Sequence, residues 1–180
     1  MILFAGRQEG TMEFQKVLDS RFSVREFLDK PVEKQKIDEI LMTAQIAPTA
    51  KNNQPQKIYV VQSKEGMDKF RQCTKCHFDA PLGFIICYDE QVSFLGRDGR
   101  QFGVLDASIV TTYMMLKATE LGLGTTWVGL FDAQKTKELF NLPDNIVPLA
   151  FLPTGYPADG CQPNPRHFDN KPLDETTEWL

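Results

Sequence analysis

The chain has 180 residues, of which 42% are hydrophobic and 24% are charged, and its net charge is −4. A chain of this length forms one ordinary domain that buries about two-thirds of the surface that its unfolded form exposes. It shows neither a run of roughly 20 apolar residues, as a membrane-spanning helix needs, nor the basic cluster typical of nucleic-acid binding. We therefore predict a single soluble domain over residues 1–180, with neither a membrane nor a nucleic acid as partner.

The opening residues lack the basic and apolar regions of a secretory signal, so we expect a cytoplasmic protein with reduced cysteines. One segment, Cys73–His77, has the Cys-x-x-Cys-His spacing of covalent c-type haem attachment, a reaction that requires export. A zinc site would need a fourth ligand, for which Cys161 and His167 are the remote candidates. The simpler interpretation, which we prefer, is a helix end and a loop that leads into a strand.

The first half of the chain is predicted to alternate helices with strands. Apolar positions indicate a first helix around Phe14–Leu18 and a second after Pro31, whose apolar residues are spaced i, i+3, i+4, i+7 until Pro48 ends it. A strand, a short helix, a buried strand and a glycine-containing loop follow, at Lys57–Val61, Glu65–Cys73, Gly83–Tyr88 and Gln91–Gly103.

Val104–Leu121 is the longest predicted helix, and it is apolar almost all round. Such a helix must be buried on all sides, which one domain struggles to achieve alone, so we expect part of its surface to form a subunit interface. The last elements are a strand, a helix, a strand and a proline-rich tail that is either disordered or laid across a partner, at Thr125–Val128, Asp132–Phe140, Pro148–Thr154 and from Tyr156 onward. The helix–strand alternation alone suggests a parallel sheet.

Two short segments carry the chemistry. Arg21–Arg25 places two guanidinium groups around a hydroxyl, and guanidinium offers a fixed, always-charged fork of donors suited to phosphate. Ala47–Pro55 is rich in amides, which both donate and accept and so can read the edge of a polar ring. The simpler readings are a solvated helix face for the first segment and turn chemistry for the second. Together the two segments point to a bound mononucleotide.

Four motifs in this order resemble the FMN-dependent nitroreductase family. They are Arg-x-Ser-x-Arg, Ala-Pro-Thr-x-x-Asn-x-Gln-Pro, Gly-Leu-Gly-Thr-x-Trp-Val-Gly-x-Phe-Asp and Gly-Tyr-Pro, and the resemblance runs from about Phe14 to Leu173. It implies an α+β fold in which helices flank a central, mostly antiparallel sheet. It also implies a homodimer with the flavin at the subunit interface, so here we follow the resemblance rather than the alternation.

The resemblance also implies contacts with FMN. Arg21 and Arg25, with Ser23 beside them, would bind the phosphate. The backbone N–H of Gly129 would reach flavin N5, where a Cβ would leave no room for the flat ring. The full set of cofactor-binding residues implied is Arg21, Phe22, Ser23, Arg25, Pro48, Thr49, Asn52, Gln54, Gly129, Leu130 and Lys171.

The tail departs from the family pattern. Family members commonly carry an arginine at the position that Asn170 occupies here, where it contributes to the phosphate site. Either Lys171 or Arg166 would supply that charge in this chain.

The activity that the resemblance implies is that of an NAD(P)H-dependent flavin oxidoreductase. NADH or NADPH would pass a hydride to flavin N5 and leave, and a quinone, nitroaromatic or similar electrophile would then take the electrons in a ping-pong cycle. The flavin does the difficult chemistry, so we assign no catalytic side chain. The alternative is a flavin-binding carrier or sensor without turnover.

Overall fold

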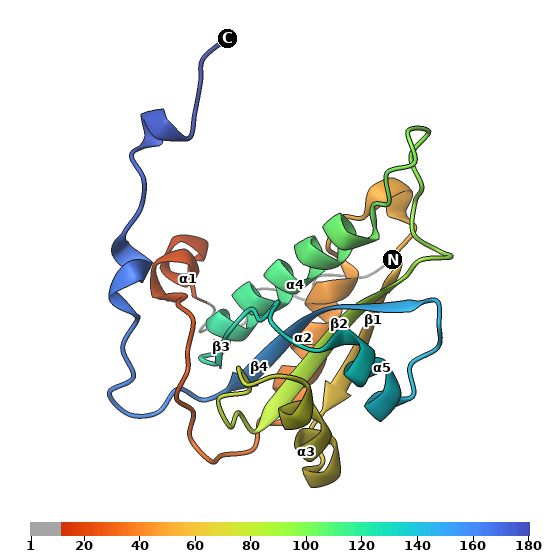
Figure 1. The fold of residues 1–180 in the computed structure, drawn as a ribbon. Coiled ribbons are helices and arrows are strands. Elements are labelled where there is room, and N and C mark those ends of the chain that lie inside the picture. Colours follow the sequence, from red (N-terminus) through yellow and green to blue (C-terminus); the bar gives the residue numbers. More distant parts are fainter. Residues whose placement is uncertain (1–11) are drawn as a thin grey trace.

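A four-stranded sheet forms the centre of the protein in a computed structural model that describes residues 12–180 (Figure 1). Its strands lie in the order β1 (Gln56–Val61), β2 (Leu82–Asp89), β4 (Ile146–Gly155) and β3 (Gly124–Thr125). All three pairings are antiparallel. The antiparallel sheet implied by the family resemblance is therefore confirmed, and the parallel sheet suggested by the helix–strand alternation is wrong. Alternation misled because the helices that join neighbouring strands bring the chain back into the sheet at the end where it left, instead of crossing to the opposite end as a parallel pair requires.

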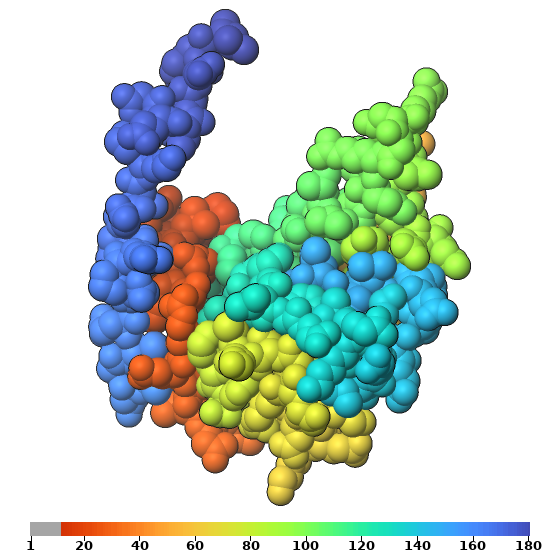
Figure 2. Space-filling model, viewed as in Figure 1, coloured from red at the N-terminus to blue at the C-terminus, as the bar shows by residue number. Residues whose placement is uncertain are grey.

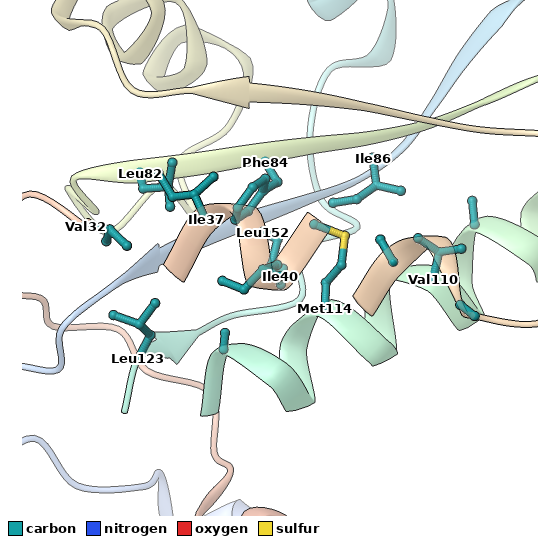
Figure 3. Packing of buried hydrophobic residues seen from close by; sticks show 14 of the residues in the cluster. Val32, Ile37, Ile40, Leu82, Phe84, Ile86, Val110, Met114, Leu123 and Leu152 are labelled. Carbon is teal, nitrogen blue, oxygen red and sulfur yellow. The ribbon is translucent and has the colours of Figure 1, made fainter. Parts of the chain in front are cut away.

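Helices cover both faces of this sheet. α2 (Lys34–Gln45) and α4 (Gly103–Glu120) pack on one face, and α3 (Lys64–Cys73) and α5 (Ala133–Phe140) on the other. Successive side chains of β2 point to opposite faces of the sheet. Phe84 and Ile86 therefore belong to the core under α2 and α4, while Ile85 belongs to the core on the opposite face. Figure 3 shows the first of these cores, with Met114 of α4 and Ile40 of α2 packed below the strands.

The two faces of α4 differ. Val110 and Met114 lie on a face that is buried within this chain, together with Ala107 and Ala118. The opposite face carries exposed apolar side chains, which are Leu105, Ile109 and Tyr113. The prediction that one chain cannot cover the whole helix is therefore right, but only for this second face.

One predicted strand is shorter than expected. In place of Thr125–Val128, only Gly124–Thr125 pairs continuously with β4, and Val128 forms a separate bridge to Phe151. The ladder breaks where Thr126 meets Pro153, because proline has no N–H to donate.

α1 and the C-terminal tail lie beside each other at one side of the molecule (Figure 1). α1 (Phe14–Ser20) leads into an extended segment, in which Ser23 forms a parallel bridge to Thr125. The tail passes α1 through the short helical turns η2 (Pro165–Phe168) and η3 (Leu173–Glu175), and its end stands away from the body (Figures 1 and 2). In the part that the structure describes, no helix has both the length and the apolar character to cross a bilayer.

Candidate functional site

A cavity lined by polar and basic side chains lies where the segment after α1 meets the tail. Arg21–Arg25 is extended rather than helical, so alternate residues point to the same side. Ser23 and Arg25 open into a cavity of about 380 Å³, whose remaining lining residues are Asn164, Arg166 and His167. The reading of the two arginines as a solvated helix face is therefore wrong, because pairing with β3 fixes the backbone in the extended state.

The tail contributes the other wall of this cavity. Asn164 accepts a hydrogen bond at its side-chain oxygen from the Arg166 N–H at 3.0 Å, which starts the η2 turn. His167 receives a contact from the Arg21 guanidinium, with 3.4 Å between Nη2 and Nδ1. Of the two candidate tail cations, Arg166 lines the cavity, while Lys171 lies on the exposed tail outside the lining. Sequence motifs could not identify Asn164 and His167 as lining residues, since neither falls in a matched motif.

The amide-rich segment forms a strained turn at the N-terminal end of α4. Lys51, Asn52 and Gln54 have φ values of 53°, 55° and 49°. Such left-handed conformations cost roughly 1–2 kcal/mol per non-glycine residue. The Thr49 hydroxyl accepts from the Gln54 N–H at 3.1 Å, so Thr49 stabilises the turn itself. The turn keeps the side chains of Asn52 and Gln54 exposed.

The Gly129–Leu130 loop is fixed by the unusual cysteine segment. The Thr74 hydroxyl donates to the Leu130 carbonyl at 2.7 Å, and the Asp132 N–H donates to the Cys73 carbonyl at 2.8 Å. Gly129 itself is exposed, so its backbone is open to a ligand.

The Cys73–His77 segment is the end of α3 and a loop leading to β2, as predicted. Burial raises the pKa of the Cys73 thiol. The cysteines are free thiols, and within residues 12–180 no three His, Cys, Asp or Glu side chains are grouped to hold a metal ion.

The predicted phosphate and ring segments lie at opposite ends of α4 within one chain (Figure 1). The turn is tied to the first turn of the helix, where Asp106 accepts from the Ala50 N–H at 2.9 Å. The arginine segment is tied to the chain just beyond the last turn, where the Val24 N–H donates to the Thr125 carbonyl at 3.0 Å. At 1.5 Å per residue, α4 extends about 20 Å from Asp106 to its last residue, Glu120, and the two anchors lie at the two ends of that length. One chain does not bring the two segments together.

Comparison with known proteins places this chain in one family. The nitroreductase family model matches residues 18–82 and 76–156, and the chain belongs to that family. A solved nitroreductase family protein from Clostridium difficile 630 is 39% identical, with a TM-score of 0.88 over 93% of this chain and 98% of that one.

Two further relatives carry names that describe a cofactor. A solved structure from Clostridium difficile R20291, named an FMN-dependent nitroreductase, is 28% identical with a TM-score of 0.73 over 85% of this chain and 93% of that one. A Bacillus subtilis (strain 168) protein named FMN reductase (NAD(P)H) is 29% identical over 173 residues, which are 86% of this chain and 70% of the relative.

Proposed function

We propose that this protein is an FMN-dependent NAD(P)H oxidoreductase that reduces quinones, nitroaromatics or similar electrophiles by a ping-pong cycle. The observation that carries the proposal is the cavity lined by Ser23, Arg25 and Arg166 on a nitroreductase fold. Relatives named FMN reductase and FMN-dependent nitroreductase support the same cofactor and the same class of reaction. A cytoplasmic location agrees with the four free thiols.

The donor set of the cavity fits a phosphate. Arg25 and Arg166 supply two guanidinium groups, Ser23 a hydroxyl and Asn164 an amide. Arg21 adds a third guanidinium through its contact with His167. Charge-assisted hydrogen bonds from guanidinium to phosphate are among the strongest that proteins form, so this cavity would hold the phosphate end of FMN.

The other two segments suit the flavin ring. When bound, FMN supplies hydride transfer at its N5 atom. The backbone N–H of Gly129 would donate to that atom, and the hydrogen bond from Thr74 to the Leu130 carbonyl supports the loop. Pro48, Thr49, Asn52 and Gln54 belong to the turn that would line the ring. Geometry from backbone donors orients the reacting groups, so no side-chain acid, base or thiol needs to act.

Two copies of the chain would complete each site. The arginine segment and the amide-rich turn stand about 20 Å apart along α4, so we assign the phosphate contacts to one copy and ring contacts to the other. The exposed apolar face of α4 continues into a groove of about 410 Å³ between α1, α2 and α4, lined in part by Phe14, Ile46 and Tyr113. We propose that this face is the dimer interface and that the tail lies across the second copy.

The experiment that tests the cofactor and the activity is a reduction assay. Protein reconstituted with FMN is expected to be yellow, and NADH or NADPH should bleach it within seconds, before a quinone restores the colour. Bound flavin that neither nicotinamide reduces would favour a carrier or sensor. Failure of the protein to bind FMN would refute the proposed function.

Replacing one guanidinium tests the phosphate cavity. Arg25→Ala should weaken FMN binding by about 2–3 kcal/mol, the cost scale of losing a hydrogen bond to a charged group. It should leave the binding of riboflavin, which has no phosphate, unchanged. Arg71→Ala is the matched control, because Arg71 pairs with Asp68 and Asp79 away from the cavity. Equal FMN dissociation constants for Arg25→Ala and the control would contradict the assignment.

A further inference from the structure

Asp106 is a buried carboxylate that none of the proposed cofactor contacts uses. It lies in the first turn of α4 and is 2% exposed. Its Oδ1 atom accepts from the Ala50 N–H at 2.9 Å. Its Oδ2 atom is buried and has no hydrogen-bond partner among residues 12–180. A buried charge with half of its acceptor capacity unused is costly, so its presence calls for an explanation beyond packing.

The partner of Asp106 begins the strained turn. Ala50 immediately precedes Lys51 and Asn52, the first two of the residues with positive φ. Within the turn, the Asn52 N–H donates to the Thr49 carbonyl at 2.9 Å. Two further hydrogen bonds join the turn to the rest of the chain. The Asn53 side chain donates to the Val92 carbonyl at 3.0 Å, and Asp106 provides a charged acceptor for the turn backbone. Strained backbone persists only where its surroundings hold it in place.

The location of Asp106 makes it an effective anchor. The N-terminal end of a helix carries partial positive charge, which stabilises a carboxylate in the first turn. α4 is also the helix with the most extensive packing face in the larger core. The hydrogen bond that Asp106 accepts therefore ties the turn to a helix that is packed into the larger core.

We propose that Asp106 is a positioning residue for the flavin ring: by holding the Ala50 N–H it keeps the turn in the conformation that presents Asn52 and Gln54. The inference rests on the proposed function, because it assigns this turn to the ring. Asp106 acts through the turn and does not touch the cofactor.

Effects on ring binding can be distinguished from effects on phosphate binding by comparing two probes, FMN and riboflavin, whose fluorescence is quenched on binding. Asp106→Ala is expected to raise the dissociation constants of both probes by the same factor, about tenfold, which is the scale of one lost charge-assisted hydrogen bond. Asp106→Asn keeps an acceptor for the Ala50 N–H, so both constants should stay within about threefold of wild type. Thr111→Val is the matched control, because the buried Thr111 hydroxyl bonds only within α4, to the Ala107 carbonyl.

A second variant removes the same hydrogen bond from the other side. Ala50→Pro deletes the donor without altering α4, and proline suits the first position of a helical turn after the extended Thr49. It should weaken both probes as Asp106→Ala does, and the double variant should be no weaker than either single one. This variant keeps the proposal testable if Asp106→Ala does not fold.

The outcomes separate this inference from the function on which it rests. Wild-type protein that binds neither probe overturns the proposed function and the inference with it. Wild-type protein that binds FMN, with Asp106→Ala or Ala50→Pro binding both probes equally well, overturns the inference alone. If these variants lose affinity for FMN alone, or if Thr111→Val loses as much affinity as they do, Asp106 does not act through the ring-binding turn.

Discussion

Burial controls the chemistry of the thiols at the scale of single residues. Cys87 lies on β2 inside the core between the sheet, α3 and α5. Burial raises the pKa of its thiol from an ordinary value of 9.0 to about 12, with a small opposing effect from Lys137. The thiolate is the reactive form of cysteine, so Cys87 is inert toward alkylation at neutral pH.

The same shift predicts a loss of stability in alkali. A raised folded-state pKa means that the native protein holds a proton that the unfolded chain releases. The stabilising contribution of the protonated Cys87 thiol to the free energy of unfolding is therefore complete below about pH 9. It is lost as the pH rises from 9.0 toward about 12. Each pH unit in that window should lower the free energy of unfolding by up to about 1.4 kcal/mol.

Urea unfolding at pH 8 and at two values above pH 9 measures this effect. Cys87→Ala should show a shallower decline with pH than wild type, whatever its absolute stability. Cys161→Ala, which alters a half-exposed thiol in the tail, should decline as wild type does. Parallel declines for wild type and Cys87→Ala would show that this thiol has no part in the alkaline transition.

Single residues also show where sequence reasoning stops. Ser23 and Arg25 could be predicted as candidate site residues, because guanidinium and hydroxyl side chains at alternate positions are typical of phosphate binding. Asp106 could not be predicted, since one acidic residue in an apolar helix looks like any polar interruption of the pattern. The role of Thr74 was hidden for a similar reason, because its partner, the Leu130 carbonyl, is 56 positions away in the chain.

At the scale of elements, β3 positions the arginine segment because its residue Gly124 has no side chain. A Cβ on Gly124 would lie 2.5 Å from Val24 Cγ2 and 2.7 Å from Val24 Cβ. Val24 is buried between Ser23 and Arg25, the two residues of this segment that line the cavity beside the tail. Relief of this clash must shift the segment that carries both.

Gly124→Ala is therefore expected to destabilise the fold by about 1–3 kcal/mol, the usual cost of overpacking. It should also weaken FMN binding more than riboflavin binding. Val24→Ala in the same chain removes Cγ2, the closest of the clashing atoms, and should recover part of the FMN affinity. Thermal unfolding and the two flavin dissociation constants check this, and the idea fails if FMN binding survives the single change or does not recover in the double variant.

Elements were predictable in type and less so in their limits. The helices at α2, α4 and α5 follow from apolar spacing and from caps, as at Asp132, whose side chain accepts from the Lys135 N–H at 2.9 Å. The break in β3 depends on Pro153, which lies in a different strand. Sheet direction likewise depends on which strands meet, and local periodicity carries no record of that.

At the scale of the whole molecule, the main feature without a partner inside the chain is apolar surface. Leu105, Ile109 and Tyr113 are each 37–39% exposed along α4, and Phe14 of α1 is 67% exposed. Contiguous apolar surface of this kind marks an interaction site in soluble proteins. The tail, which projects from the body (Figure 2), adds the exposed side chains of Leu173 and Trp179. Both features, and the proposed division of the cofactor site, are explained together if two copies associate.

A charge placed on this face tests the dimer directly. Ile109→Asp is expected to shift the mass measured by light scattering at micromolar concentration from twice the 20.5 kDa chain mass toward a single chain. The side chain of Ile109 is partly exposed within the chain, so the fold should survive, unlike after a charge at the buried Val110. Because each site would need two copies, FMN affinity should fall together with dimerisation. Gln134→Asp, which adds the same charge on α5 across the sheet, should change neither. Wild-type protein that has the mass of one chain and still binds FMN fully would show that a single copy builds the site, and that the 20 Å between its two segments is closed by movement within the chain.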